Sequence, residues 1–228
     1  MPRAEWHGAC FCAIMGGNSG SNGEEDPPME LYAIVQPMVF TADRYRDTTG
    51  EDDPEELTLL QLADKEQAGK VAGVLNDLYG IESDLADPRD DEGLDEQVGT
   101  LEGLHELRRM AAAVHGKTPD DYYEGRVPPG FPFNHLINHD DADGYYLPAD
   151  FLHAFFIEET SIGSAVALLR ELDALESVLA SAFPDQVRAA LAAGNGDSAG
   201  LDGPVAVWHN LRRFCRSAID LDLPFRFG

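Results

Sequence analysis

Basic residues are scarce in this sequence. Among its 228 residues, 16 are lysine or arginine and 42 are aspartate or glutamate, which gives a formal net charge of −26. Only three of the basic residues are lysines, at Lys65, Lys70 and Lys117. Nucleic-acid binding needs basic side chains that displace counterions from phosphates, and anionic membranes attract basic segments. We therefore expect neither a nucleic acid nor a membrane surface as the partner.

Cysteines and long apolar runs are also scarce. Cys10, Cys12 and Cys215 are odd in number, and the first two lie only two positions apart, so they do not form the disulfide framework of a secreted domain. No stretch approaches the roughly 18 uncharged apolar residues of a membrane helix. The apolar run ACFCAIM follows Arg3 and Glu5, unlike the basic start of a signal peptide. The sequence predicts a soluble cytoplasmic protein.

Complete catalytic signatures are missing too. No glycine-rich phosphate loop follows a predicted strand, which argues against dinucleotide-binding and P-loop chemistry. No G-x-S-x-G elbow occurs, and no cysteine has a neighbouring histidine that would activate it. Nucleophilic catalysis therefore finds little support in the sequence.

Acidic residues, by contrast, are abundant, and three interpretations of them stay open. The charge can serve solubility in a saline cytoplasm, where salt screens the repulsion between carboxylates. It can attract a basic protein partner by electrostatic steering. It can also bind a divalent metal ion, because carboxylate oxygens are hard ligands.

The chain divides into an appendage and one domain. Residues 1–28 contain the run GGNSGSNGEEDPP, which is rich in glycine, serine, asparagine and acid and has no periodicity. Met29 opens the first credible element and is an alternative start of the functional chain. We predict a flexible N-terminal appendage over residues 1–28 and a single domain over residues 29–228.

Apolar periodicity and capping residues predict the helices. Ser161 is the expected N-cap of the clearest one, whose apolar stripe comprises Leu168, Leu172, Leu175 and Leu179. The predicted helical ranges are 54–79, 99–115, 161–183, 186–193 and 205–219.

The predicted strands are short. Residues 31–35 form the first, and GYYLP at 144–148 forms a second, paired in a hairpin across an acidic turn. The final LDLPFRFG is expected to be an edge strand. Residues 82–96 hold eight acids against Arg89, and we interpret them as a solvated loop or a strip that faces a partner. The fold class is α+β, a helix-dominated single domain with a small antiparallel sheet.

One stretch, HDDADGYYLPAD at residues 139–150, resembles the twelve-residue calcium loop of EF-hand proteins. The resemblance rests on positions 1, 3, 5, 6 and 12 of the loop, which are His139, Asp141, Asp143, Gly144 and Asp150. It implies calcium held by these residues. The sequence departs from the pattern in the histidine at position 1, the short aspartate at position 12 and Pro148.

The same stretch supports two further interpretations. His135 and His139 are four residues apart and lie on one face, so with nearby aspartates and His153 they suit zinc, iron or manganese. An open position on such a metal would activate water for hydrolysis. Alternatively, Asp140–Gly144 is only a hairpin turn with both histidines as strand residues beside it.

A second group of polar residues lies on the last predicted helix. The positions of His209, Arg212, Arg213 and Arg216 follow a helical spacing that makes one basic stripe. The stripe can grip a phosphate or carboxylate ligand through the planar arginine groups. It can instead pair with acids of the protein itself, which we expect in a chain this acidic.

Two functional hypotheses follow. The first is a non-enzymatic acidic binding or regulatory module whose surface meets a basic protein. The second is a metal-dependent hydrolase that uses the His/Asp cluster at residues 135–153 with a divalent metal as cofactor. Elemental analysis of the purified protein distinguishes them.

Overall fold

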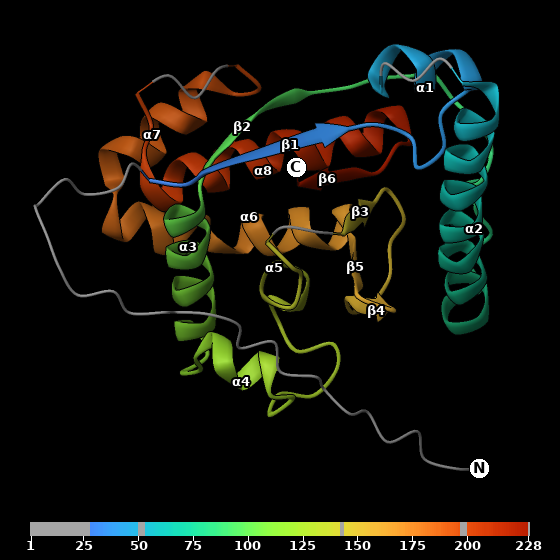
Figure 1. The fold of residues 1–228 in the computed structure, drawn as a ribbon. Helices are drawn as coiled ribbons and strands as arrows, with labels where there is room; N and C mark the ends of the chain where they lie inside the picture. The colour runs from blue at the N-terminus through green and yellow to red at the C-terminus, as the bar shows by residue number, and fades with distance from the viewer. Residues whose placement is uncertain (1–27, 50–52, 142–143, 197–199, 228) are drawn as a thin grey trace, which may run out of the picture.

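The computed structural model describes residues 28–49, 53–141, 144–196 and 200–227, and Figure 1 shows how they fold. The predicted appendage therefore lies almost wholly outside the described residues. The elements in chain order are β1 (Glu30–Val35), α1 (Ala42–Thr49), α2 (Pro54–Tyr79), β2 (Asp95–Thr100), α3 (Leu101–Ala113), α4 (Pro119–Tyr123), α5 (Asn134–Ile137), β3 (Tyr145–Leu147), β4 (Phe155–Ile157), β5 (Thr160–Ser164), α6 (Ala165–Ala182), α7 (Pro184–Ala193), α8 (Gly203–Leu221) and β6 (Phe225–Phe227).

The domain is α+β, as predicted, with one sheet of six strands in the order β2-β1-β6-β3-β5-β4. The sheet is mixed, because β3 and β5 pair in parallel. The antiparallel strand β4 joins them and lies outside β5. The expectation of an edge strand at the C-terminus was wrong: β6 lies between β1 and β3. Its alternating pattern explains this position, because Phe225 and Phe227 are both buried.

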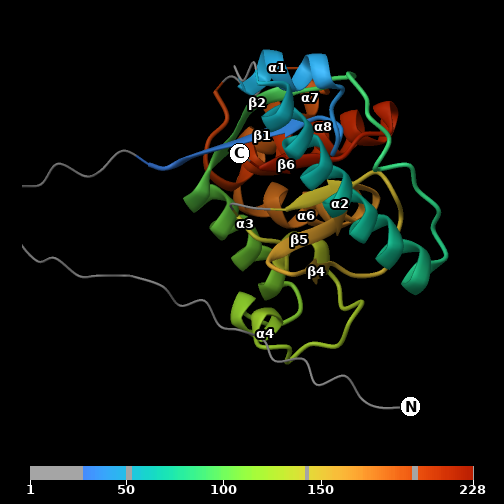
Figure 2. The same ribbon diagram turned by 45° about the vertical axis from the view of Figure 1, so that its right-hand side comes forward.

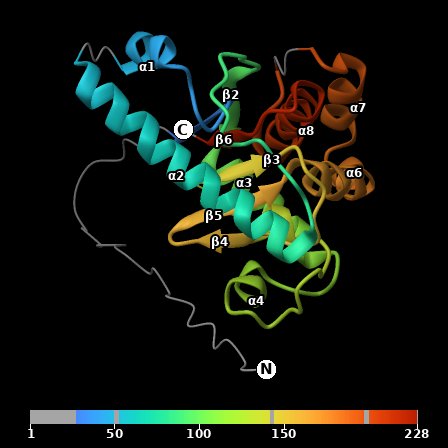
Figure 3. The same cartoon turned by 90° about the vertical axis from the view of Figure 1, so that its right-hand side faces the viewer.

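Two hydrophobic clusters pack on opposite faces of the sheet. The larger unites β1, β2 and β6 with α3, α6, α7 and α8. The smaller joins α2 to residues of β3, β4 and β5, and Figure 3 shows α2 crossing this part of the sheet. Neighbouring residues of β3 separate between them: Tyr146 belongs to the larger cluster and Leu147 to the smaller. This separation follows from the alternation of side chains along a strand.

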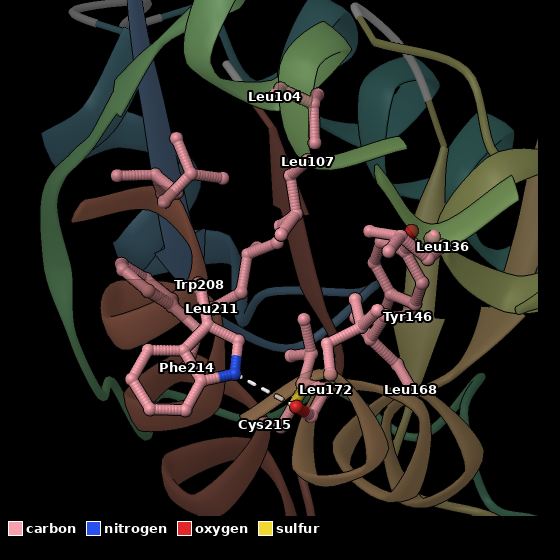
Figure 4. Packing of buried hydrophobic residues seen from close by; sticks show 14 of the residues in the cluster. Leu104, Leu107, Leu136, Tyr146, Leu168, Leu172, Trp208, Leu211, Phe214 and Cys215 are labelled. Atoms are coloured by element: carbon pink, nitrogen blue, oxygen red, sulfur yellow. Dashed lines mark hydrogen bonds between the residues drawn. The ribbon is translucent and has the colours of Figure 1, made fainter. Parts of the chain in front are cut away.

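Helix α8 is the centre of the larger cluster. Its Trp208, Phe214 and Cys215 are fully buried, and the indole N–H of Trp208 donates a 2.8 Å hydrogen bond to the carbonyl of Leu172 on α6. Figure 4 shows these side chains packed together with Leu211. Such a bond lets a buried tryptophan keep its polar group satisfied.

The long helix α2 has the bounds predicted from the sequence. Asp53 caps its start by accepting a hydrogen bond from the backbone N–H of Glu55, and Pro54 occupies the first turn. Gly80 ends it with φ of 66°, a left-handed conformation that glycine adopts without strain. Local signals therefore fixed both ends of this helix.

The predicted cap of α6 was wrong. Ser164 caps the helix and accepts a hydrogen bond from the N–H of Ala167, whereas Ser161 lies within β5. Residues 155–164 form a hairpin of β4 and β5 instead of a helix start. The apolar stripe itself, from Leu168 to Leu179, is buried as predicted.

The predicted hairpin across the acidic turn was also wrong. Residues Asn134–Ile137 form the short helix α5, not a strand, and all four are buried. The described partners of β3 are β5 and β6. A four-residue helix between two loops gives no usable periodicity, so the sequence did not indicate it.

Candidate functional site

Asp141, a predicted metal ligand, is held by a buried arginine. Arg108 of α3 is 2% exposed and ion-pairs with the Asp141 carboxylate. Its other nitrogens donate hydrogen bonds of 2.8 and 2.6 Å to the carbonyls of Leu136 and His139. His105 Nε2 lies 2.6 Å from the same carboxylate. This arrangement fixes the chain after α5, and sequence spacing alone did not indicate Arg108.

Both predicted histidine ligands are buried and engaged with the backbone. The imidazole of His135 accepts a hydrogen bond at Nδ1 from the N–H of Ser164, 3.0 Å away, and donates from Nε2 to the carbonyl of Phe151, 3.1 Å away. His139 places Nδ1 at 2.9 Å from the carbonyl of Asp140 and stacks on Tyr146 at 3.9 Å between ring centroids. Burial lowers the pKa of each histidine to about 4.

The remaining predicted ligands lie elsewhere. Asp150 ion-pairs with Arg170 on α6, and Tyr79 is the neighbour of the His153 ring, at 5.8 Å between centroids. Asp143 lies outside the described residues. Within the part of the chain that the structure describes, no three His, Cys, Asp or Glu side chains lie close enough to hold a metal ion. His135, His139, Asp141 and Asp150 therefore do not form the metal site together, and a site that involves Asp143 stays a prediction.

The basic stripe of α8 pairs mainly with the protein itself. Arg212 meets Asp173 at 2.8 Å and lies over the Trp208 ring, and Arg213 meets Glu96 at 2.8 Å. Both ion pairs confirm the internal interpretation. Arg216 instead donates to the amide oxygen of Asn195 at 3.1 Å.

Two arginines of the stripe are largely enclosed. The side chains of Arg212 and Arg213 are only 13% and 9% exposed. His209 Nε2 lies 3.2 Å from the carbonyl of Gly196. The stripe therefore fastens α8 to the elements around it.

The segment that follows α2 is an exposed acidic feature of the fold. We call it the acidic strip and define it by the carboxylates at Glu82, Asp84, Asp87, Asp90, Asp91, Glu92, Asp95 and Glu96, all of which are exposed. Apart from an isolated bridge at Arg89, residues 80–94 lie outside strands and helices. Figure 2 shows the segment returning from the end of α2 toward β2 as an extended track.

Three of the eight carboxylates in the strip have a basic partner among the described residues. Asp91, Glu92 and Glu96 ion-pair with Arg89, Arg44 and Arg213. Asp90 accepts a 2.6 Å hydrogen bond from the Thr41 hydroxyl. Among the described residues, no arginine, lysine or histidine ion-pairs with the other four carboxylates, which are those of Glu82, Asp84, Asp87 and Asp95.

Folding adds charge to the strip from a distant part of the sequence. Arg89 donates hydrogen bonds of 2.9 and 3.2 Å to the carbonyls of Asp222 and Leu221 at the end of α8. As a result Asp222 lines the same depression as Glu82 and Asp84, with a volume of about 110 Å³. Sequence reasoning named the strip but missed this convergence, because the segments lie far apart in the chain.

One family model matches most of the chain. The family model described as "Putative DNA-mimic protein" matches residues 52–227, which include the strip and all elements from α2 to β6. No curated protein and no solved structure matches the chain. Among the described helices none is long and apolar enough to cross a membrane. The chain belongs to the family of putative DNA-mimic proteins.

Proposed function

We propose that this protein occupies the DNA-binding surface of a basic protein and so takes the place of the nucleic acid. The observation that carries the proposal is the exposed acidic strip, in which eight acids oppose one arginine over residues 82–96. The family description supports it, since DNA mimicry requires a negative surface that a DNA-binding protein accepts. We further propose that the encounter takes place in the cytoplasm, as the sequence predicted.

The charge density of the strip sets a requirement on the rest of the surface. An extended chain spans at most about 3.6 Å per residue, so the strip covers no more than about 54 Å and carries roughly one carboxylate per 7 Å. One strand of B-DNA carries a phosphate about every 3.4 Å. A fully extended strip would therefore be sparser than a phosphate strand, and carboxylates from neighbouring elements raise the density of charge.

Two neighbouring elements supply such carboxylates. Asp220 and Asp222 lie at the end of α8, where Arg89 holds the strip. Asp77 lies in the last turns of α2, just before the strip begins, and is exposed. The proposed mimic surface is thus composite, with the strip at its centre.

Four carboxylates of the strip are available to bind basic side chains of a partner. Glu82, Asp84, Asp87 and Asp95 have no competing internal ion pair among the described residues. A lysine or arginine of the partner then meets each without first displacing an arginine of this chain. Exposed charges of this kind steer association and make the affinity fall with salt.

A displacement assay tests the proposal with linker histone bound to a fluorescent DNA duplex. We expect the protein to release the duplex. The combined variant Glu82→Gln, Asp84→Asn, Asp87→Asn and Asp95→Asn should need at least about tenfold more protein, which corresponds to about 1.4 kcal/mol.

A matched control removes the same amount of charge elsewhere. The variant Asp120→Asn, Glu159→Gln, Asp185→Asn and Asp202→Asn changes four exposed acids outside the strip and should stay within about twofold of the unmodified protein. Equal losses in both variants would mean that only the net charge matters, and the proposed surface would be rejected.

A further inference from the structure

A cleft opens beside the start of the acidic strip, where Ile81 lines it and Glu82 follows in the chain. Its volume is about 670 Å³, within the range of small-molecule sites. It is bounded by the end of α2, the loop before α5, residues 150–152 and α6. Its apolar and aromatic lining is formed mainly by Tyr79, Phe131, Phe133, Phe151, Leu152 and Ala174.

One carboxylate distinguishes this cleft. Glu171 of α6 lines it and is partly buried. Its two oxygens accept hydrogen bonds from the backbone N–H groups of His135 and Leu136, at 3.1 and 2.8 Å. Burial raises the pKa of Glu171 to about 8. An ionised carboxylate has about four acceptor positions, so Glu171 can accept from a ligand in addition to the backbone N–H groups of α5.

The other charged and titratable groups of the cleft do not neutralise Glu171. Arg170 is paired with Asp150 in two hydrogen bonds, and His135 has both nitrogens engaged with the backbone. His115 packs edge-on against Phe131 at 5.4 Å between ring centroids. With the Arg170–Asp150 pair balanced, an ionised Glu171 leaves the cleft with a negative charge.

We propose that this cleft binds a small organic cation, with an amidinium, guanidinium or ammonium group paired to Glu171 and an apolar body against the aromatic lining. Two observations select this class of ligand. Aromatic faces attract cations, and Tyr79 and Phe131 both line the cleft. A planar amidinium donates two parallel hydrogen bonds to a carboxylate. This proposal is independent of the DNA-mimic proposal.

Binding of benzamidine, measured by isothermal titration calorimetry, tests the cation site. Benzamide has the same shape without the charge and should bind at least about tenfold more weakly. The affinity for benzamidine should rise from pH 6 to pH 8, because a cation prefers ionised Glu171 and benzamidine stays charged throughout. Equal binding of benzamide and benzamidine would overturn the proposal.

Two substitutions locate the site. Glu171→Gln should weaken benzamidine binding at least about tenfold and remove its pH dependence, whereas a pH dependence that persists would contradict the pairing of the cation with Glu171. Ala174→Phe fills the cleft from an exposed position on α6 and should abolish binding with the fold intact. Asp173→Asn, on the same helix but outside the cleft lining, should stay within about twofold. Unchanged binding in Ala174→Phe would place benzamidine elsewhere and reject the site.

The source of the cation is distinguished by the histone displacement assay. If the ligand is a free small molecule, Ala174→Phe should release the DNA duplex as well as the unmodified protein does. If the cation is a side chain of the basic partner, the same substitution should weaken release and benzamidine should compete with linker histone. Failure of the unmodified protein to release the duplex, with benzamidine binding intact, would count against the DNA-mimic surface alone.

Discussion

Carboxylates in two regions of this molecule have opposite environments. Around α5, Asp141 is held by Arg108 and His105, and Glu171 accepts two backbone N–H groups. In the acidic strip, Glu82 and Asp84 face water with no ion pair among the described residues. The same chemical group thus fixes the backbone in one region and presents bare charge in the other.

The difference teaches how an acidic protein divides its charge. A carboxylate near the core must be paired or hydrogen-bonded, because an unpaired buried charge costs several kcal/mol. A carboxylate on an extended surface segment costs little and stays free for a partner. Acid content alone therefore does not locate a binding surface, and the internal partners of each acid must be known.

The largest expected effect comes from breaking the paired region. Arg108→Met should lower the free energy of unfolding by about 3 kcal/mol or more, since it removes the arginine that pairs with Asp141 and leaves the carbonyls of Leu136 and His139 without their donor. Urea denaturation measures the change.

The neighbouring arginine provides the control. Arg109 is exposed and pairs with Glu102 and Glu106 on the surface. Arg109→Met should cost no more than about 1 kcal/mol. A similar loss in both variants would show that the Arg108 cluster does not stabilise the fold as its burial indicates.

The pH dependence of stability sharpens the contrast. Glu171 has a folded pKa of about 8 against an ordinary value of 4.5, so the folded state holds the extra proton and stability falls as pH rises between those values. His135 and His139 have folded pKa values of about 4 against 6.5, so the unfolded state holds extra protons and stability falls as pH decreases over that interval.

The window from pH 6.5 to 8 isolates Glu171. Only the Glu171 contribution changes there among these three groups, with a slope of at most about 1.4 kcal/mol per pH unit. The variant Glu171→Gln should flatten the decline of the unfolding free energy in that window. An identical decline in the variant would remove Glu171 from the explanation.

The smallest effect on stability is expected in the strip. Repulsion between exposed carboxylates is screened by salt, so the melting temperature should rise over the first few hundred millimolar sodium chloride or so. At low salt, the free energy of unfolding of the strip variant with four neutral amides should lie within about 1 kcal/mol of that of the unmodified protein. The melting temperature of the variant should also depend less on salt. A melting temperature that is flat or falls with salt would contradict this account.

The sequence by itself determined the acidic surface and most of the helical frame. Asp53, Pro54 and Gly80 defined α2 through capping, which acts within a few residues. Leu168–Leu179 and the apolar positions of α8 revealed their buried faces through periodicity. The composition left a basic protein partner as one of three interpretations of the charge, and the same acidic residues marked the strip.

Only the tertiary structure decided which distant groups meet. The placement of β6 inside the sheet, the contact of Arg89 with the end of α8 and the arrival of Arg108 beside Asp141 join segments far apart in the chain. Local patterns carry no record of such pairings, because spacing reports only on neighbours within a few turns. In the sequence, Glu171 is indistinguishable from other helical acids. Only the fold places two backbone N–H groups of α5 against it and buries it, which raises its pKa.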